Sequence, residues 1–293
     1  MKFVAEMLNI DTKPRRWGIW SVAQQDAANR SGPGYDKNLR AYCPMNPKSL
    51  WPKGYEIMFG LAGNPAFQPD PARGLMRVHY QHRVGKVGLD SAAGWLATVH
   101  GSSGRVFVQR FQYFPAKKYP DDASVEIWLH GPGEYVVAGR IEKLEDDPRK
   151  CPYLIETELL SPLANLMPGG RFTFAYDWAA TSLGGDFPVI DCTEAGVVSQ
   201  PLSVRRLPNG MMTLSGRFGV FYQGSVAIRF YGDKDLPIAA GAQDRSVDPA
   251  QPLVLTNSMV PFHAPAEART VRLLLRRRDG RLVGELARAT LSN

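Results

Sequence analysis

The sequence has few cysteines and no long apolar run. Only Cys43, Cys151 and Cys192 occur among its 293 residues, and their wide spacing fits neither a metal-ligand pattern nor a dense disulfide framework. The count allows one bridge but favours free thiols. Because no stretch of 18 or more apolar residues occurs, we expect no membrane-spanning helix.

A secretion signal is also missing from the N-terminal residues. The short apolar stretch after Met1 is broken by Glu6, and no small-residue cleavage site follows it. We therefore expect this segment to belong to the folded structure. If a signal was removed ahead of this sequence, the protein is periplasmic or extracellular; otherwise it is cytoplasmic.

The common motifs of cofactor and nucleophile chemistry are absent. There is no phosphate-binding loop, no glycine-rich dinucleotide motif before a helix, no G-x-S-x-G and no H-E-x-x-H. We therefore expect no cofactor. His79 and His82 resemble a metal pair, but a spacing of three on one strand turns the rings to opposite faces. A metal held by carboxylates and histidines from different strands stays open.

The charge balance is basic. A net charge of +7 and a pI of about 9.3 favour anionic partners, among them acidic sugars, phosphates and nucleic acid, although a soluble basic protein has the same balance. The most basic run, Arg276–Arg281, is not interleaved with aromatic residues. Nucleic acid is therefore not the expected partner.

The distribution of glycine, proline and apolar residues predicts an all-β protein. Twenty-eight glycines and 23 prolines argue against long helices, and short alternating runs dominate. Asp279–Gly280 predicts a tight hairpin turn. Residues 27–70 are rich in Gly, Pro and Asn, which predicts a long loop region. A change of composition after Met167 predicts two regions, 1–168 and 169–293.

Alternate residues of a strand share a face, and several expected strands have a polar face. If these faces line one sheet, they gather aromatic, amide and charged groups. Aromatic rings stack on the apolar face of a pyranose while polar groups bind its hydroxyls, so this mixture suits a sugar; the alternative is a face that simply meets water. The candidate binding residues are Trp20, Gln24, Arg77, Arg83, Lys86, Arg110, Tyr113, Glu126, Trp128 and His130.

The strand predicted at Tyr153–Leu160 carries two carboxylates on one face. Glu156 and Glu158 share that face with Leu154 and Leu160. They are either solvated surface charges or the acid and base of a site. A like charge beside a carboxylate raises its pKa, which suits a general base.

Several segments, taken in order, are similar to a known family. They are "NIDTKPRRWGIWSVAQ", "YCPMNPKS", "KVGLDSAAGWLATV", "FVQRFQYFPAKKYPDDASVEIW" and "YLIETELLSPLANLMPGGRFTFAYDW". From Asn9 to Trp178 the chain resembles the DUF4380-type family of the galactose mutarotase-like superfamily. The resemblance implies a large antiparallel β-sandwich. The residues after 178 then form either further strands or an appended Ig-like β-domain.

The resemblance also implies roles for particular residues. In mutarotases a late strand carries the glutamate that acts as general base, and a histidine protonates the ring oxygen. The matching strand here makes Glu156 the first candidate for the base and Glu158 the second. Trp20 stands where a ligand-binding histidine is expected, so the acid must come from His79, His82 or His130.

The resemblance therefore implies a protein that acts on a sugar through a Glu base and a His acid on the concave sheet face. Such an enzyme would be an epimerase or a polysaccharide hydrolase or lyase. The basic balance favours an acidic sugar, whose charge Arg77, Arg83, Lys86 or Arg110 would hold. The alternatives are a non-catalytic carbohydrate-binding module and a structural sandwich that binds a partner protein. The sequence leaves the oligomeric state open.

Overall fold

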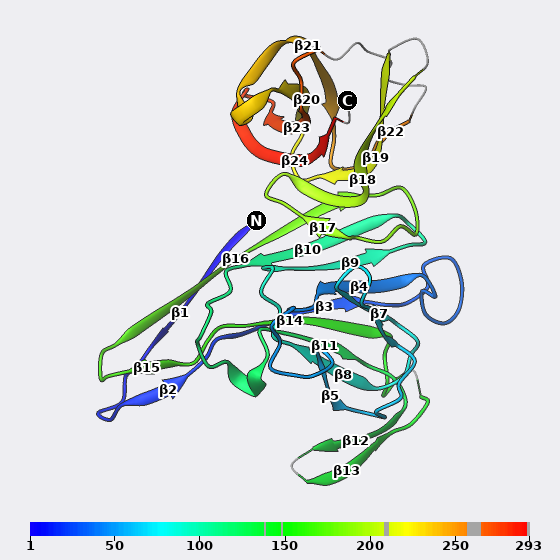
Figure 1. The fold of residues 1–293 in the computed structure, drawn as a ribbon. Coiled ribbons are helices and arrows are strands. Elements are labelled where there is room, and N and C mark those ends of the chain that lie inside the picture. The colour runs from blue at the N-terminus through cyan, green and yellow to red at the C-terminus, as the bar shows by residue number, and fades with distance from the viewer. Residues whose placement is uncertain (138, 148, 208–210, 257–264, 292–293) are drawn as a thin grey trace. The chain divides into compact units, whose positions relative to one another are not determined.

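The computed structural model describes residues 1–137, 139–147, 149–207, 211–256 and 265–291 (Figure 1). These residues are nearly all in strands and loops, with two short 3-10 turns, η1 (Pro120–Asp122) and η2 (Asp233–Asp235), so the all-β prediction is confirmed. No helix of the described residues is long and apolar enough to cross a membrane.

The chain divides into two compact units. The first contains residues 1–102 and 107–179, and the second contains residues 103–106 and 180–293. The main passage from one to the other lies inside a single strand, between Ala179 and Ala180, whereas the composition change in the sequence lies near 168.

Two antiparallel sheets form the first unit. The larger has seven strands, in the spatial order β1 (Lys2–Leu8), β16 (Arg171–Ser182), β10 (Arg105–Phe111), β9 (Trp95–His100), β4 (Leu39–Pro44), β7 (Leu75–His79) and β6 (Phe67–Asp70). The smaller has five, in the order β3 (Trp20–Asp26), β14 (Leu154–Leu160), β11 (Val125–Leu129), β8 (Gly85–Leu89) and β5 (Glu56–Phe59).

The hydrophobic core of this unit combines residues of both sheets, which makes it a β-sandwich. Met76 and Val78 on β7 and Val87 and Ile127 on the smaller sheet are completely buried in one cluster. Gln25 joins the sheets through the core, because its Nε2 donates to Thr98 Oγ1 (3.1 Å) and to Thr157 Oγ1 (2.9 Å). Since side chains alternate along a strand, the neighbours of these core residues lie on the outer faces.

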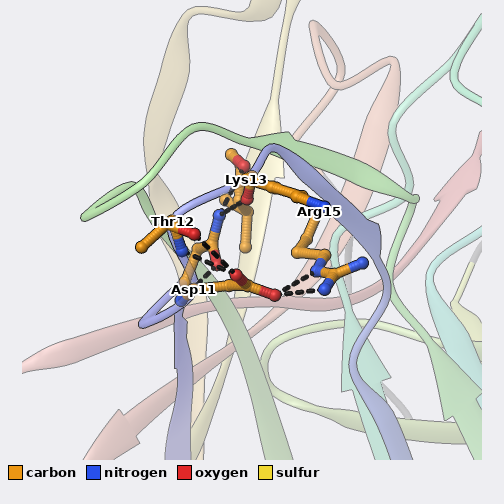
Figure 2. Close-up of polar contacts among 6 residues, drawn as sticks. Asp11, Thr12, Lys13 and Arg15 are labelled. Atoms are coloured by element: carbon orange, nitrogen blue, oxygen red, sulfur yellow. Dashed lines mark hydrogen bonds and ion pairs between the residues drawn. The ribbon is translucent and has the colours of Figure 1, made fainter.

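Two short ribbons extend from this sandwich: β2 (Arg15–Trp17) with β15 (Ala164–Leu166), and β12 (Gly133–Val137) with β13 (Arg140–Leu144). The turn before β2 is held by its own side chains (Figure 2). Asp11 pairs with Arg15, which keeps the pKa of that carboxyl below its usual range. Asn9 donates to Lys13 O (2.9 Å) and to Leu166 O (2.8 Å), which joins β1, β2 and β15 at this turn.

The second unit also has two antiparallel sheets. One has the order β17 (Asp191–Cys192), β18 (Gly196–Arg206), β19 (Met212–Val220) and β22 (Leu253–Leu255), and the other β21 (Pro237–Val247), β20 (Gly224–Tyr231), β23 (Thr270–Arg277) and β24 (Leu282–Thr290). Leu214, Phe218, Phe230 and Leu273 lie in its buried core. The expected hairpin turn joins β23 to β24, with Gly280 at φ +82°.

The prediction of a long loop over residues 27–70 is wrong in part. This segment contains β4, β5 and β6, and β4 is a central strand paired with β7 and β9. Leu39, Ala41 and Cys43 alternate into the core, so the strand is short but strongly buried. The surrounding Gly, Pro and Asn residues mask this alternation in the sequence.

Candidate functional site

The outer face of the five-stranded sheet brings together eight of the residues that the sequence analysis selected. Glu156 on β14 lies opposite Gln24 on β3 and Trp128 on β11, and Trp128 lies opposite Lys86 on β8. In the next row Glu158 lies opposite Glu126. We call this surface the β14 face. It carries Trp20, Gln24, Lys86, Glu126, Trp128, His130, Glu156 and Glu158.

Three charged side chains of the β14 face form a buried cluster. Lys86 Nζ contacts a carboxylate oxygen of Glu126 and lies 3.0 Å from Glu158 Oε2. The indole Nε1 of Trp20 donates to Glu158 Oε2 at 2.5 Å. Glu126 is fully buried and Glu158 and Lys86 nearly so. Among the described residues, Glu126 Oε1 has no hydrogen-bond partner.

Aromatic side chains and one methionine cover this cluster. Lys86 Nζ lies 4.7 Å from the ring centre of Trp20 and 5.9 Å from that of Phe59, which are cation–π distances. Phe59 meets Trp128 edge-on at 5.5 Å, and Tyr135 on β12 meets Trp128 at 5.8 Å. The cluster is therefore shielded from water although it lies on an outer face.

Gly88 makes room for part of this cover. It lies opposite Glu126, and a Cβ at this position would collide with the terminal methyl of Met58. Met58 occupies a register shift of β5, between Ile57 and Phe59. The register shift in β5 thus places the Met58 side chain over Gly88, where the absence of a side chain leaves room for it.

Burial changes the protonation of the cluster. It raises the pKa of Glu126 to about 7, although the Lys86 ammonium opposes the rise. It also raises the pKa of Glu158, again against Lys86 and the Trp20 donor. Burial alone would lower the pKa of Lys86, but the two carboxylates outweigh it and keep the pKa above its ordinary value. Burial of the cluster therefore favours the protonated form of its carboxyls, most of all that of Glu126.

The accessible part of the β14 face lies beside the cluster. Trp20 is 42% exposed, although its indole N–H is used by Glu158. Gln24 is exposed and its Nε2 donates to Glu156 Oε1 at 2.8 Å. His130 follows β11 near Glu156, and burial lowers the pKa of its ring, while hydrogen bonding to the backbone of Lys150 and the charge of Glu156 act in the opposite direction. This part of the face exposes an indole and an amide and, in part, a carboxylate.

The two glutamates of the β14 strand thus have different environments. Glu158 is buried and ion-paired, whereas Glu156 is partly exposed and meets only an amide donor. Of the two, only Glu156 has a side chain open to solvent, and Glu158 holds Trp20 and Lys86.

Arg77, His79 and Arg110 do not lie on this face. They belong to β7 and β10 of the seven-stranded sheet, and Arg77 and His79 alternate with the core residues Met76 and Val78. They therefore point away from the core on the opposite side of the sandwich, and His79 Nε2 lies 2.7 Å from Lys37 O. The expectation of one common polar face is wrong for these residues, because β7 belongs to a different sheet from β8.

His82 and Arg83 lie outside any strand. β7 ends at His79, so the expectation that His79 and His82 lie on one strand is wrong. His82 has φ +47° and lies against Tyr153 with ring centres 4.4 Å apart, and its Nε2 is 3.2 Å from Cys151 O. This histidine packs in an aromatic group, and Arg83 is exposed in the loop before β8.

Tyr113 lines a cavity that contains none of the other candidate binding residues. It stacks in parallel on Tyr119, with ring centres 5.5 Å apart. The cavity has a volume of about 360 Å³, and its rim includes Lys117 and Lys118. Asp90, also in its lining, accepts hydrogen bonds from Ser49 Oγ and Leu50 N.

Sequence reasoning missed Met58, Phe59 and Tyr135. Phe59 and Met58 lie in the segment expected to be loop, and Tyr135 lies on a ribbon outside the main sheets. A short apolar run, Ile57–Phe59, in the Gly- and Pro-rich region was the available signal. Within the described ranges, no group of three or more His, Cys, Asp or Glu side chains is arranged to hold a metal ion.

Comparisons with known proteins do not identify this chain. No family model matches it, and no curated protein matches it. A solved structure of a DUF4785 family protein from Legionella pneumophila aligns with 99% of this chain and 92% of its own, at 11% identity and a TM-score of 0.20. A similarity of that size supports no statement about family or function, and the resemblance to the DUF4380-type family is not confirmed.

Proposed function

We propose that the β14 face binds a carbohydrate. The observation that carries this proposal is that the half-exposed Trp20 indole lies on the same sheet face as the Gln24–Glu156 pair, with the exposed Val22 between them on β3. An indole stacks on the apolar face of one sugar ring, and an amide and a carboxylate four residues along the strand, about 13 Å away, bind hydroxyls of a neighbouring ring. Glu158 holds the Trp20 ring through its N–H, so the platform is fixed before a ligand arrives.

The charges of this face favour a neutral saccharide over an acidic one. Three glutamates lie on it, and its one lysine is already engaged by Glu126 and Glu158. Arg77 and Arg110, which were expected to hold an acidic group, lie on the other sheet. The positive net charge of the chain is therefore not concentrated on the β14 face.

A second candidate function is acid–base chemistry on the bound sugar. The observation that favours it is the placement of a carboxylate, Glu156, close enough to the His130 ring for its charge to act on the pKa of that ring. In a mutarotase-like reaction, Glu156 would take the proton of the anomeric hydroxyl and His130 would act on the ring oxygen. Both are on the accessible part of the same face.

Saturation-transfer NMR on a panel of neutral and uronate-containing oligosaccharides tests the proposal. We expect transfer to neutral members, lost in Trp20→Ala and kept in Trp17→Ala. Trp17 is a matched control because it is 65% exposed but lies on the β2–β15 ribbon. Transfer that survives Trp20→Ala, or silence across the neutral members, would refute the binding face.

The same samples separate binding from catalysis. Exchange between anomers or new product signals that disappear in Glu156→Gln, with saturation transfer retained, would establish the enzymatic candidate. Binding without either signal would identify a non-catalytic module.

A further inference from the structure

The seven-stranded sheet has an open edge at β1. β1 is the last strand of its sheet and pairs on one side with β16, and no other described strand pairs with it (Figure 1). It has seven residues and contains neither a proline nor a register shift against β16. Natural edges are usually blunted by such devices, because a free edge can pair with another strand.

The hydrogen bonds to β16 define which residues face outward at this edge. Asn9 N donates to Gly170 O at 2.9 Å, and Trp178 N donates to Met1 O at 2.7 Å. Hydrogen-bonded pairs alternate in an antiparallel ladder, so the odd-numbered residues of β1 bond to β16. The backbone N–H and C=O groups of Lys2, Val4, Glu6 and Leu8 therefore point to the open edge.

The side chains of these same residues all lie on one face. Phe3 stacks on Tyr176 on the other face, with ring centres 5.1 Å apart, which anchors β1 to its own sheet. Lys2, Val4, Glu6 and Leu8 are exposed, and Val4 is 62% exposed. Glu6 pairs with Arg171 on β16, and its side chain remains 46% exposed. The edge thus presents free backbone groups together with the alternation Lys, Val, Glu, Leu.

This alternation is complementary to itself in the antiparallel sense. If two copies meet with Val4 opposite Val4, then Lys2 of each lies opposite Glu6 of the other. Shifting the register by two residues in either direction opposes Lys2 to Val4 or to Leu8 and loses both charge pairs. The register centred on Val4 also makes each outward-facing pair a hydrogen-bonded one.

We propose that β1 is the interface of a symmetric dimer, in which two copies pair edge to edge about Val4 and join their seven-stranded sheets. The partner at this edge is a second copy of the chain, because in an antiparallel pair the Lys2 of each copy faces the Glu6 of the other. Cross-strand charge pairs and a central apolar pair both favour the arrangement. An edge of this length buries less than a permanent interface, so the dimer is concentration-dependent.

Sedimentation equilibrium of the full chain tests the proposal, with any tag placed at the C-terminus. We expect the mass to rise with concentration from 32.4 kDa toward twice that value. Val4→Pro removes an N–H that points outward and leaves the bonds to β16 intact, as edge positions tolerate, so it should remain monomeric with an unchanged circular dichroism spectrum.

Charge exchange checks the register independently of that variant. Lys2→Glu places like charges opposite each other and should weaken the dimer by about tenfold, since two attractive pairs become repulsive. The triple variant Lys2→Glu with Glu6→Lys and Arg171→Glu should restore it, because the third change keeps the ion pair between position 6 and β16. A wild-type chain that stays at 32.4 kDa at every concentration, a folded Val4→Pro dimer, or failure of the triple variant to recover would each overturn the proposal.

Discussion

The buried Lys86–Glu126–Glu158 cluster predicts that this protein is more stable at pH 5 than at pH 8. Glu126 has a pKa of about 7 in the folded chain, against an ordinary 4.5. A carboxyl whose pKa is raised by folding stabilises the protein below its unfolded pKa, and that stability is lost as the pH rises through the folded value. The loss from Glu126 therefore falls between about pH 4.5 and pH 7.

The magnitude follows from the two pKa values. A difference of about 2.5 units corresponds to about 3 kcal/mol of unfolding free energy, at 1.36 kcal/mol per unit. In the first unit this lowers the melting temperature by about 6–12 °C, using about 2–4 °C per kcal/mol for a domain of its size. The raised pKa of Glu158 acts in the same direction. Lys86 does not contribute in this range, because its raised pKa matters only above its ordinary 10.5.

Calorimetry at pH 5 and pH 8 on the wild type, Glu126→Gln and Glu156→Gln measures this effect. The lowered pKa of His130 gives the opposite slope below its ordinary 6.5, so the difference between wild type and Glu126→Gln isolates the carboxyl. Glu126→Gln should flatten the pH dependence of the first unit, and the accessible Glu156→Gln should keep most of it, because Glu156 acts on Glu158 and His130 only as a lesser contribution from its charge. Equal slopes in wild type and Glu126→Gln, or greater wild-type stability at pH 8 than at pH 5, would refute the reasoning.

Three further predictions concern the same sandwich. Lys86→Met leaves two carboxylates buried without their counter-charge, so urea denaturation should show a loss of about 3–5 kcal/mol at pH 8 and a smaller loss at pH 5, where the carboxylates take up protons. Gly88→Ala should cost about 1 kcal/mol, because its methyl displaces only the flexible tip of Met58, and Met58→Ala in the same chain should recover part of that loss in a double-mutant cycle. Burial raises the pKa of the Cys43 thiol to about 12, so Ellman's reagent should leave Cys43 unmodified in the native chain and reach it only after denaturation; fast native reaction at Cys43 would contradict its burial.

The alternation of strand residues was enough to predict much of the β14 face. Glu126 and Trp128 share a face because they are two apart on β11, and Glu156 and Glu158 do so on β14. The pairing of β11 with β14 then places Glu126 beside Glu158 and Trp128 beside Glu156, and this pairing has no local signal in the sequence. The burial of Glu126 and Glu158 could not be predicted for the same reason, since Met58 and Phe59 come from a strand inside an apparent loop.

The assignment of Arg77, His79 and Arg110 failed on a different point. Alternation of polar and apolar residues shows that a strand has one face toward solvent, but it does not show to which of two sheets the strand belongs. Consecutive strands joined by a tight turn usually pair in one sheet. β7 and β8 are consecutive in the chain, but they lie in different sheets. The polar faces of a sandwich therefore point in two opposite directions, and only the pairing of strands separates them.

The coupling within the Lys86–Glu126–Glu158 cluster also bears on how the sequence can change during evolution. Replacing one member leaves the others buried without their charge partners, which destabilises the protein. Replacing all three by apolar residues of similar volume can leave the stability unchanged or raise it. When residues are substituted one at a time, any first substitution in the cluster lowers the stability of the protein. The cluster therefore persists even after a binding role is lost. Among divergent homologues, retention of the lysine and the two glutamates would therefore indicate common descent. Retention of Trp20, Gln24 and Glu156 would indicate that the binding role is kept.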